Sequence, residues 1–473
     1  MAEREFYRDI YSEVKMSIMA NIVTFLLGPR KCGKTFCLSQ IEREIENSRY
    51  YNLKAMGDTE KDNLILEICE SIQKDNNIIY LIDEVTYIDK PELALLAIYD
   101  AMSENGNTTT RVVFTGSQSV ALKSWADKYF CGCAGYVYAD FMNYDEWLRY
   151  KGGLKASEES YKQFIDEIDK FYNMTSIEEY LEGCLNETVV SNSKSMNLIF
   201  NNNCTGLTVD FLLDVLYSVL ICLHNKVRYT TFINRGQFEK TLRFMLSGIK
   251  IDDNVKNNIG LLLNQRYNSF KKCDETSLKK ALVFLYNCGL ITFTYVGTHC
   301  EEWNIANKLL NECISLDSKT DYKGKVFDTY NIFIKHPMFY MGLIKQVISN
   351  ATTKNVKGVL LGSIVECHVR GLLPQKGQYE YHGISEDNTE VEVDYVSDSL
   401  YFAVEITVSD NHGNSFQVLR DKELAKKEEE RNNYSFIMLT KSLKYKKGDT
   451  EYIPYYDYIQ LLSSENNPYK LCT

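Results

Sequence analysis

The sequence predicts a multidomain α/β protein, and three observations support this class. The chain has 473 residues, which is too long for one ordinary core and predicts roughly two to four domains. An apolar run at 22–27 leads directly into a glycine-rich loop at 28–35, as in the strand-to-helix connections of nucleotide-binding α/β folds. Apolar and polar residues alternate again at 391–396, which indicates a second sheet.

The composition is that of a folded protein, with 45% hydrophobic and 25% charged residues. Its net charge of -11 repels phosphate, so any nucleic-acid contact requires a local basic patch. The 14 cysteines are scattered without paired C-x-x-C spacing, which argues against a disulfide framework or a zinc site. We therefore expect a reduced protein.

The sequence also predicts a cytoplasmic protein with no membrane contact. The first 15 residues contain acids and lack an uninterrupted apolar segment, so they do not form a secretory signal. The most hydrophobic tract, 207–223, carries Asp210 and Asp214, which favours a buried helix over a membrane span.

The strongest motif follows a predicted helix at 5–20 and the strand at 22–27. It has the pattern G-x-x-x-x-G-K-[ST], the phosphate-binding loop, in which glycines let the backbone N–H groups surround an anion. Lys34 reaches the outer phosphates, the Thr35 hydroxyl is a ligand for Mg²⁺, and the helix after Thr35 directs its N-terminus at the anion. The loop consists of Gly28, Pro29, Arg30, Lys31, Cys32, Gly33, Lys34 and Thr35.

A second apolar strand, at 77–82, ends in Asp83 and Glu84. We expect a buried parallel strand here, which brings Asp83 to the Mg²⁺ ion and Glu84 to the water that must be polarised against the γ-phosphate. A plain transition from strand to turn also produces this pattern. The phosphate-binding loop upstream favours the nucleotide interpretation.

A third strand, at 110–115, ends in small polar residues. Ser117, or alternatively Thr115, is expected to lie between the first two strands and to sense the γ-phosphate.

These segments, LLGPRKCGKT, LIDEV and VVFTGSQS, resemble the AAA-type ATP-binding domain of a large bacterial and archaeal ATPase family. The C-terminal half of that family is related to PD-(D/E)XK nucleases. The family places a Gly-Arg pair after the third strand, where this chain has Gly135 and Tyr136. A later family segment fits residues 141–147. If the family arginine contacts the nucleotide, this chain lacks its contribution to hydrolysis at Tyr136. Arg149 is the nearest arginine downstream.

Residues 157–223 have helical periodicity and resemble a lid over the ATPase core. In the segment that follows, a helix at 277–286 is expected to begin after Thr276 and end at Gly289, before a strand at 290–295. This order is typical of a winged helix. Basic residues in the segment form either a phosphate-facing surface or an ordinary solvated face: Arg266, Lys271, Lys272, Lys279 and Lys280.

Three acids in the C-terminal region form a candidate second site. Glu366 lies on a predicted helix, Asp394 on the strand at 391–396, and Glu405 on the strand at 401–407. Carboxylates from adjacent strands can hold a Mg²⁺ ion that activates water against a phosphodiester. The nucleases that the region resembles carry a lysine two residues after the second acid, where this chain has Thr407. An inactive scaffold or binding module is therefore favoured over an active nuclease.

The expected domains are a P-loop ATPase domain at 1–155, a helical lid or linker at 156–228, a winged-helix-like segment at 229–300 and a PD-(D/E)XK nuclease-like domain at 301–473.

The expected function is an ATPase that uses ATP and Mg²⁺ to control the C-terminal domain. One alternative is a nucleotide-gated DNA nuclease of a defence type, with DNA bound by the winged-helix or nuclease-like region. Another is a non-enzymatic regulator that ATP switches. The expected ATPase and both alternatives are compatible with a homo-oligomer.

Overall fold

A computed structural model gives the fold of the chain. It describes residues 6–106, 108–117, 119–130, 132–171, 177–190, 207–225, 275–296, 330–347, 359–374, 378–385, 387–411, 415–422, 424 and 433–469. The chain divides into two compact units. The first comprises Met1–Glu146, Tyr172–Met174 and Glu178–Thr205, and the second comprises Trp147–Phe171, Thr175–Ile177 and Gly206–Thr473.

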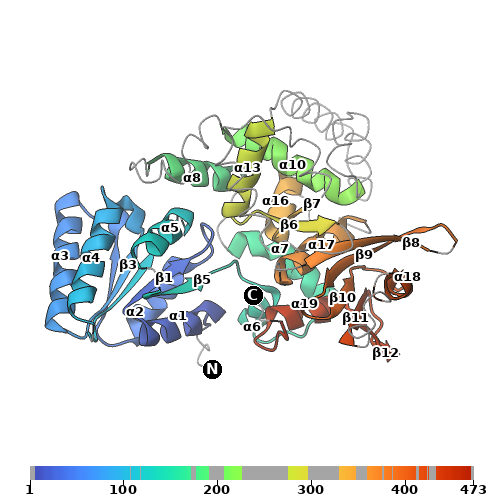
Figure 1. The fold of residues 1–473 in the computed structure, drawn as a ribbon, viewed down its shortest axis with the longest axis horizontal. Helices are drawn as coiled ribbons and strands as arrows, with labels where there is room; N and C mark the ends of the chain where they lie inside the picture. The colour runs from blue at the N-terminus through green and yellow to red at the C-terminus, as the bar shows by residue number, and fades with distance from the viewer. Residues whose placement is uncertain are drawn as a thin grey trace. The chain divides into compact units, whose positions relative to one another are not determined.

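The first unit is built around a five-stranded parallel sheet (Figure 1). Its strands are β1 (Val23–Leu27), β2 (Ser48–Asn52), β3 (Ile79–Asp83), β4 (Arg111–Thr115) and β5 (Ala134–Tyr138), in the spatial order β2-β3-β4-β1-β5. The strands predicted at 22–27, 77–82 and 110–115 are confirmed. β4 lies between β1 and β3, so the ends of all three strands meet at one edge of the sheet.

Helices cover both faces of this sheet (Figure 1). On one face, α3 (Asp58–Lys74), α4 (Pro91–Glu104) and α5 (Ser119–Tyr129) enclose a core that includes Val23, Phe25 and Phe114. On the other, α1 (Asp9–Ala20) packs on β1 and β5, and α2 (Lys34–Glu44) packs on β2. The β1 strand is fully buried because helices cover both of its faces.

The second unit contains an eight-stranded sheet in the order β12-β13-β11-β10-β9-β8-β6-β7. The strands are β6 (Ile291–Val296), β7 (Tyr330–Ile334), β8 (Gln378–Ile384), β9 (Glu390–Ser397), β10 (Phe402–Glu405), β11 (Ser435–Thr440), β12 (Tyr445–Lys447) and β13 (Thr450–Pro454). Strands β8, β9 and β10 are antiparallel neighbours, whereas β10 and β11 are parallel. The register of β8 and β9 shifts between Tyr379 and Tyr381, a bulge opposite Asp394 and Tyr395.

Among the described residues, the helices of the second unit are α7 (Glu158–Phe171), α10 (Val209–Asn225), α13 (Glu275–Asn287), α16 (Pro337–Val347), α17 (Val359–Leu372), α18 (Ser415–Lys422) and α19 (Tyr455–Ser463). The helix and glycine stop predicted around 277–289 are confirmed, since α13 ends before Gly289, whose φ is 75°. The following strand, β6, pairs with β7 and β8. The boundary expected at residue 300 therefore falls between two strands of one sheet.

The residues expected to form a lid, 156–228, are divided between the two units. Helices α7 and α10 belong to the second unit, whereas most of α8 (Ile177–Val190) belongs to the first. In the first unit, Arg30 of the loop lies against Gly183 of α8, where an added Cβ would come within 2.1 Å of Arg30 Nη1. α6 (Tyr144–Tyr150) begins in the first unit and ends in the second.

Candidate functional site

The loop at 28–35 connects the C-terminal end of β1 to α2. Three of its residues have positive φ: Gly28 at 142°, Lys31 at 57° and Gly33 at 94°. A Cβ at Gly28 would lie 2.1 Å from the Ala139 carbonyl oxygen, so only glycine allows the loop to pass the end of β5. α2 begins at Lys34, and its free N–H groups and dipole therefore face an anion placed at this loop.

Lys34 is buried within the loop. Its Nζ donates to the carbonyl oxygens of Gly28 and Pro29, at 2.8 and 2.7 Å. The neighbouring Cys32 is also buried, and burial raises the pKa of its thiol, so this side chain is neutral. Lys34 is therefore a buried positive charge of the loop, next to the main-chain groups that an anion would contact.

Asp83 is the last residue of β3 and is 2% exposed. Its Oδ2 accepts from the Thr35 hydroxyl at 2.7 Å and from the Tyr50 hydroxyl at 2.9 Å. Its Oδ1 accepts from the Glu84 N–H at 3.0 Å. The structure thus joins the predicted pair Thr35 and Asp83 directly.

Glu84 follows in the left-handed conformation, with φ at 57°. The Ser117 hydroxyl donates to Glu84 Oε1 at 2.6 Å, and the Ser117 N–H donates to Oε2 at 3.1 Å. Ser117 reaches Glu84 because it follows β4, which lies next to β3. Thr115, the alternative to Ser117, is fully buried and donates to the Leu26 carbonyl oxygen at 2.7 Å. Its hydroxyl therefore forms a hydrogen bond within the sheet.

The position of the missing family arginine is half-buried in the first unit. Tyr136 stacks on Phe25 and donates its hydroxyl to Asp127 of α5 at 3.0 Å. Gly135 lies on the opposite face, where a Cβ would come within 2.2 Å of Ser17 Oγ on α1. Arg149 is exposed on the part of α6 that belongs to the second unit.

Three contacts at the loop were not predicted. Tyr50 joins Asp83 from β2, Ser119 at the start of α5 exchanges hydrogen bonds with the main chain of Gly28, and Arg8 donates to Cys32. These residues are 33, 91 and 24 positions from their partners, and no local spacing marks them.

The candidate acids of the C-terminal region surround an arginine. Arg370 of α17 is 2% exposed and forms ion pairs with Glu366, Glu380 and Asp394 at 3.0, 3.2 and 3.4 Å. Burial by itself would lower the pKa of Arg370, but Glu380, Glu366 and Asp394 outweigh burial and raise it.

The other groups at this position are engaged in local contacts. Asp394 Oδ2 accepts from the Ile406 N–H at 2.7 Å, and Glu405 accepts from Ser415 at 3.3 Å. Thr407, at the position of the absent lysine, accepts from the Ser409 N–H at 3.1 Å. Across the ranges that the structure describes, no three His, Cys, Asp or Glu side chains are grouped so that they could hold a metal ion.

Of the basic residues noted in the middle segment, Lys280 is the one whose side chain is described; Arg266, Lys271, Lys272 and the Lys279 side chain lie outside the described residues. None of the described helices is long and apolar enough to cross a membrane.

Residues 20–148 match a family model described as an AAA domain. Among solved structures, a Walker-type ATPase of Pyrococcus abyssi has a TM-score of 0.36 at 13% identity, covering 72% of this chain and 97% of that chain. The AMPPCP-bound DnaA of Aquifex aeolicus has a TM-score of 0.26 at 15% identity, covering 58% and 96%. The Orc1 protein of Aeropyrum pernix in complex with DNA has a TM-score of 0.25 at 10% identity, covering 74% and 94%. A search of curated proteins found no match.

The family match coincides with the sheet and loop described above. Both the five-stranded parallel sheet and the phosphate-binding loop lie within the matched residues. The part of the chain that is similar to an AAA domain is therefore the part that carries the parallel sheet and the phosphate-binding loop.

Proposed function

We propose that this protein is an ATPase whose nucleotide state controls its C-terminal module. The hydrogen bonds that join Thr35 to Asp83 and Ser117 to Glu84 carry the proposal. In this proposal the groups that act in ATP hydrolysis follow β1, β3 and β4, which are neighbours in the sheet.

The residues at this edge fit ATP and Mg²⁺. The main-chain N–H groups of 28–35 and the Lys34 ammonium would contact the phosphates, and the Thr35 hydroxyl and Asp83 carboxylate are the oxygen donors that Mg²⁺ prefers. When bound, the ion supplies neutralisation of the charge that develops on the phosphate oxygens.

Glu84 is the proposed base for the attacking water, and Ser117 the proposed γ-phosphate sensor. Ser117 holds both carboxylate oxygens of Glu84, so its hydroxyl cannot donate at the same time to a phosphate oxygen. In this proposal a γ-phosphate competes for the Ser117 hydroxyl and frees Glu84 to accept a proton from water.

Two substitutions test the site. Lys34→Ala is expected to abolish ATP binding measured by calorimetry, whereas Lys74→Ala, which removes an exposed lysine of α3, is expected to leave it unchanged. Glu84→Gln is expected to bind ATP but hydrolyse it about 10² to 10⁴ times more slowly. Undiminished affinity in Lys34→Ala would refute the site, and an unchanged rate in Glu84→Gln would assign the base elsewhere.

For the C-terminal module we propose a PD-(D/E)XK-like scaffold that binds its target without cleaving it. The order α17, β8, β9, β10, α18, β11, with β10 and β11 parallel, supports the resemblance stated from the sequence. The ion pairs of Arg370 with Glu366 and Asp394 favour a scaffold over a nuclease, because the guanidinium already contacts the carboxylates that a metal ion would need.

A nicking assay separates the scaffold from the nucleotide-gated DNA nuclease. Supercoiled DNA is incubated with Mg²⁺ and the wild type or Asp394→Ala, with and without ATP. We expect no nicking in any condition. Nicking by the wild type that Asp394→Ala abolishes would establish the nuclease instead, whereas steady-state ATP hydrolysis would exclude the purely non-enzymatic regulator.

A further inference from the structure

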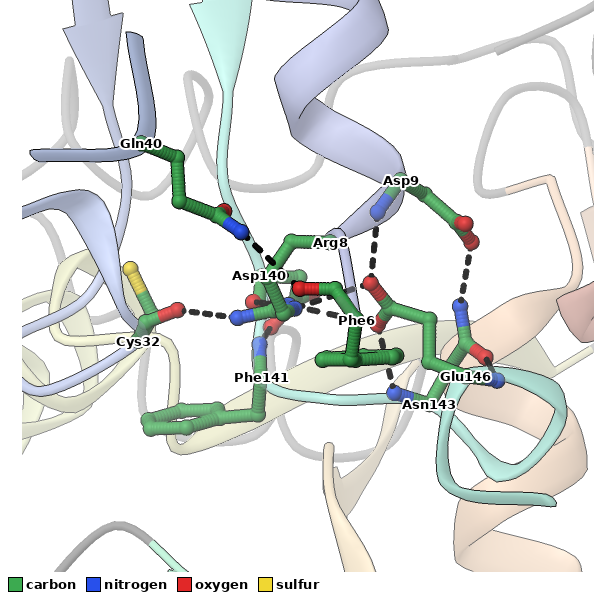
Figure 2. Close-up of polar contacts among 9 residues, drawn as sticks. All are labelled: Phe6, Arg8, Asp9, Cys32, Gln40, Asp140, Phe141, Asn143 and Glu146. Carbon is green, nitrogen blue, oxygen red and sulfur yellow. Dashed lines mark hydrogen bonds and ion pairs between the residues drawn. The ribbon is translucent and has the colours of Figure 1, made fainter. Parts of the chain in front are cut away.

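Arg8, which precedes α1, is buried against the phosphate-binding loop. It is 3% exposed, and its guanidinium donates to three separate parts of the first unit (Figure 2). Nη1 donates to the Cys32 carbonyl oxygen at 2.6 Å, Nη2 donates to the Asp140 carbonyl oxygen at 2.8 Å, and Nε pairs with Glu146 Oε1 at 2.8 Å. Arg8 therefore connects the loop to the segment between β5 and α6.

The Cys32 contact fixes a peptide group of the loop. A trans peptide is planar, and its C=O and N–H point in opposite directions. The partner of the Cys32 carbonyl in that peptide is the N–H of Gly33, so a guanidinium that holds the carbonyl also directs this N–H away from Arg8. Arg8 also fills the space beside Gly33, where a Cβ would lie 2.8 Å from Nη1.

Glu146 keeps the guanidinium in place. Besides the Nε contact, its Oε2 accepts from Arg8 Nη2 at 3.3 Å. It also accepts from the N–H groups of Asp9 and Asn143, at 2.8 and 3.0 Å. The N-terminal segment is held from the other side by Gln40 of α2, which donates to the Phe6 carbonyl oxygen at 2.9 Å.

Burying an ion pair costs desolvation free energy. A buried ion pair therefore seldom stabilises a fold more than apolar side chains of similar size would. This pair is 3% and 2% exposed, so stability alone is a weak reason for it. A rigid guanidinium that donates in three directions does, however, fix geometry in a way that an apolar side chain cannot.

We infer that Arg8 is a positioning residue for phosphate binding: held by Glu146, it orients the Cys32–Gly33 peptide so that the Gly33 N–H faces the phosphates. The inference rests on the proposed nucleotide function of the loop. It predicts that Arg8 acts on the affinity of folded protein for nucleotide in addition to stability.

Calorimetric titration of the full chain with ATP and Mg²⁺ tests this, because it reports the dissociation constant separately from the fraction of competent protein. The variants are Arg8→Met and the conservative Arg8→Lys. The matched control is Arg111→Met, which removes an arginine that donates to the carbonyl oxygens of Ile18, Thr108 and Thr110 at the start of β4.

We expect Arg8→Met to raise the dissociation constant about tenfold or more, with Arg8→Lys intermediate and Arg111→Met within about twofold of wild type. If Arg8→Met and wild type share one dissociation constant and differ only in competent fraction, the role is structural and the inference fails. If Arg8→Met does not fold, the same comparison is made with Arg8→Lys, and wild-type affinity there overturns the inference. A wild type that binds no nucleotide would instead refute the proposed function.

Discussion

Tyr50 shows how one hydroxyl from an unpredicted strand can support the site. It shares Asp83 Oδ2 with Thr35, and burial together with the charge of Asp83 raises the pKa of Tyr50. The hydroxyl therefore remains protonated at physiological pH and remains a donor. A donor to a carboxylate that ligates a metal orients that carboxylate.

We expect Tyr50→Phe to raise the Mg²⁺ concentration needed for half-maximal ATP hydrolysis about tenfold, because Asp83 loses a group that orients it. Tyr51→Phe is the control, since the neighbouring Tyr51 ring stacks on Tyr80. The measurement is a Mg²⁺ titration of the hydrolysis rate at saturating ATP. Identical Mg²⁺ dependence in the two variants would show that Tyr50 plays no part at the metal.

At the level of elements, the apolar runs before the loop and before Asp83 predicted two strands of the site correctly, since a parallel strand buried on both faces is apolar throughout. β2 and β5 were not predicted. β2 has the sequence Ser-Arg-Tyr-Tyr-Asn and is only partly buried, so it lacks that signal. Arg8 and Tyr50 were missed for a related reason: their partners lie far along the chain, and only the fold brings them together.

The contacts of the residues at the end of β4 favour Ser117 over Thr115 as the proposed sensor. We expect Ser117→Ala to bind ATP but to lower the rate of hydrolysis at saturation at least tenfold, as loss of a donor to developing charge does. Thr115→Val removes a hydroxyl that bonds to Leu26 and should leave the rate within about twofold. Single-turnover measurements with both variants test this. A rate loss in Thr115→Val without one in Ser117→Ala would reverse the assignment.

Across the whole molecule, the same kind of sequence pattern gave different results in the two units. In the first unit, Thr35 and Asp83 meet as the motifs predicted. In the second, Glu366 and Asp394 also come close, but both pair with Arg370. The acids alone predicted a metal site. The contact of these acids with Arg370, one helical turn after Glu366, could not be predicted because the direction of its side chain depends on how α17 packs on the sheet.

Arg370 provides a direct test of whether these buried acids depend on a protein cation for their charge. Arg370→Met leaves Glu366, Glu380 and Asp394 without their counter-charge, and removing one partner of a buried ion pair costs about 3 to 5 kcal/mol of unfolding free energy. Carboxylates buried close together bind protons more readily than they do in the unfolded chain. The folded variant therefore takes up protons, and its stability relative to wild type falls as the pH rises.

Urea unfolding of the full chain at about pH 5, 6.5 and 8 measures the difference in stability between Arg370→Met and wild type. These pH values lie above the ordinary carboxylate pKa values. The control is Arg420→Met, whose partner Asp449 is 53% exposed, and where we expect a loss below about 1 kcal/mol. A deficit independent of pH would mean that Arg370 stabilises the second unit through packing on Phe333 and not through the charges of these acids.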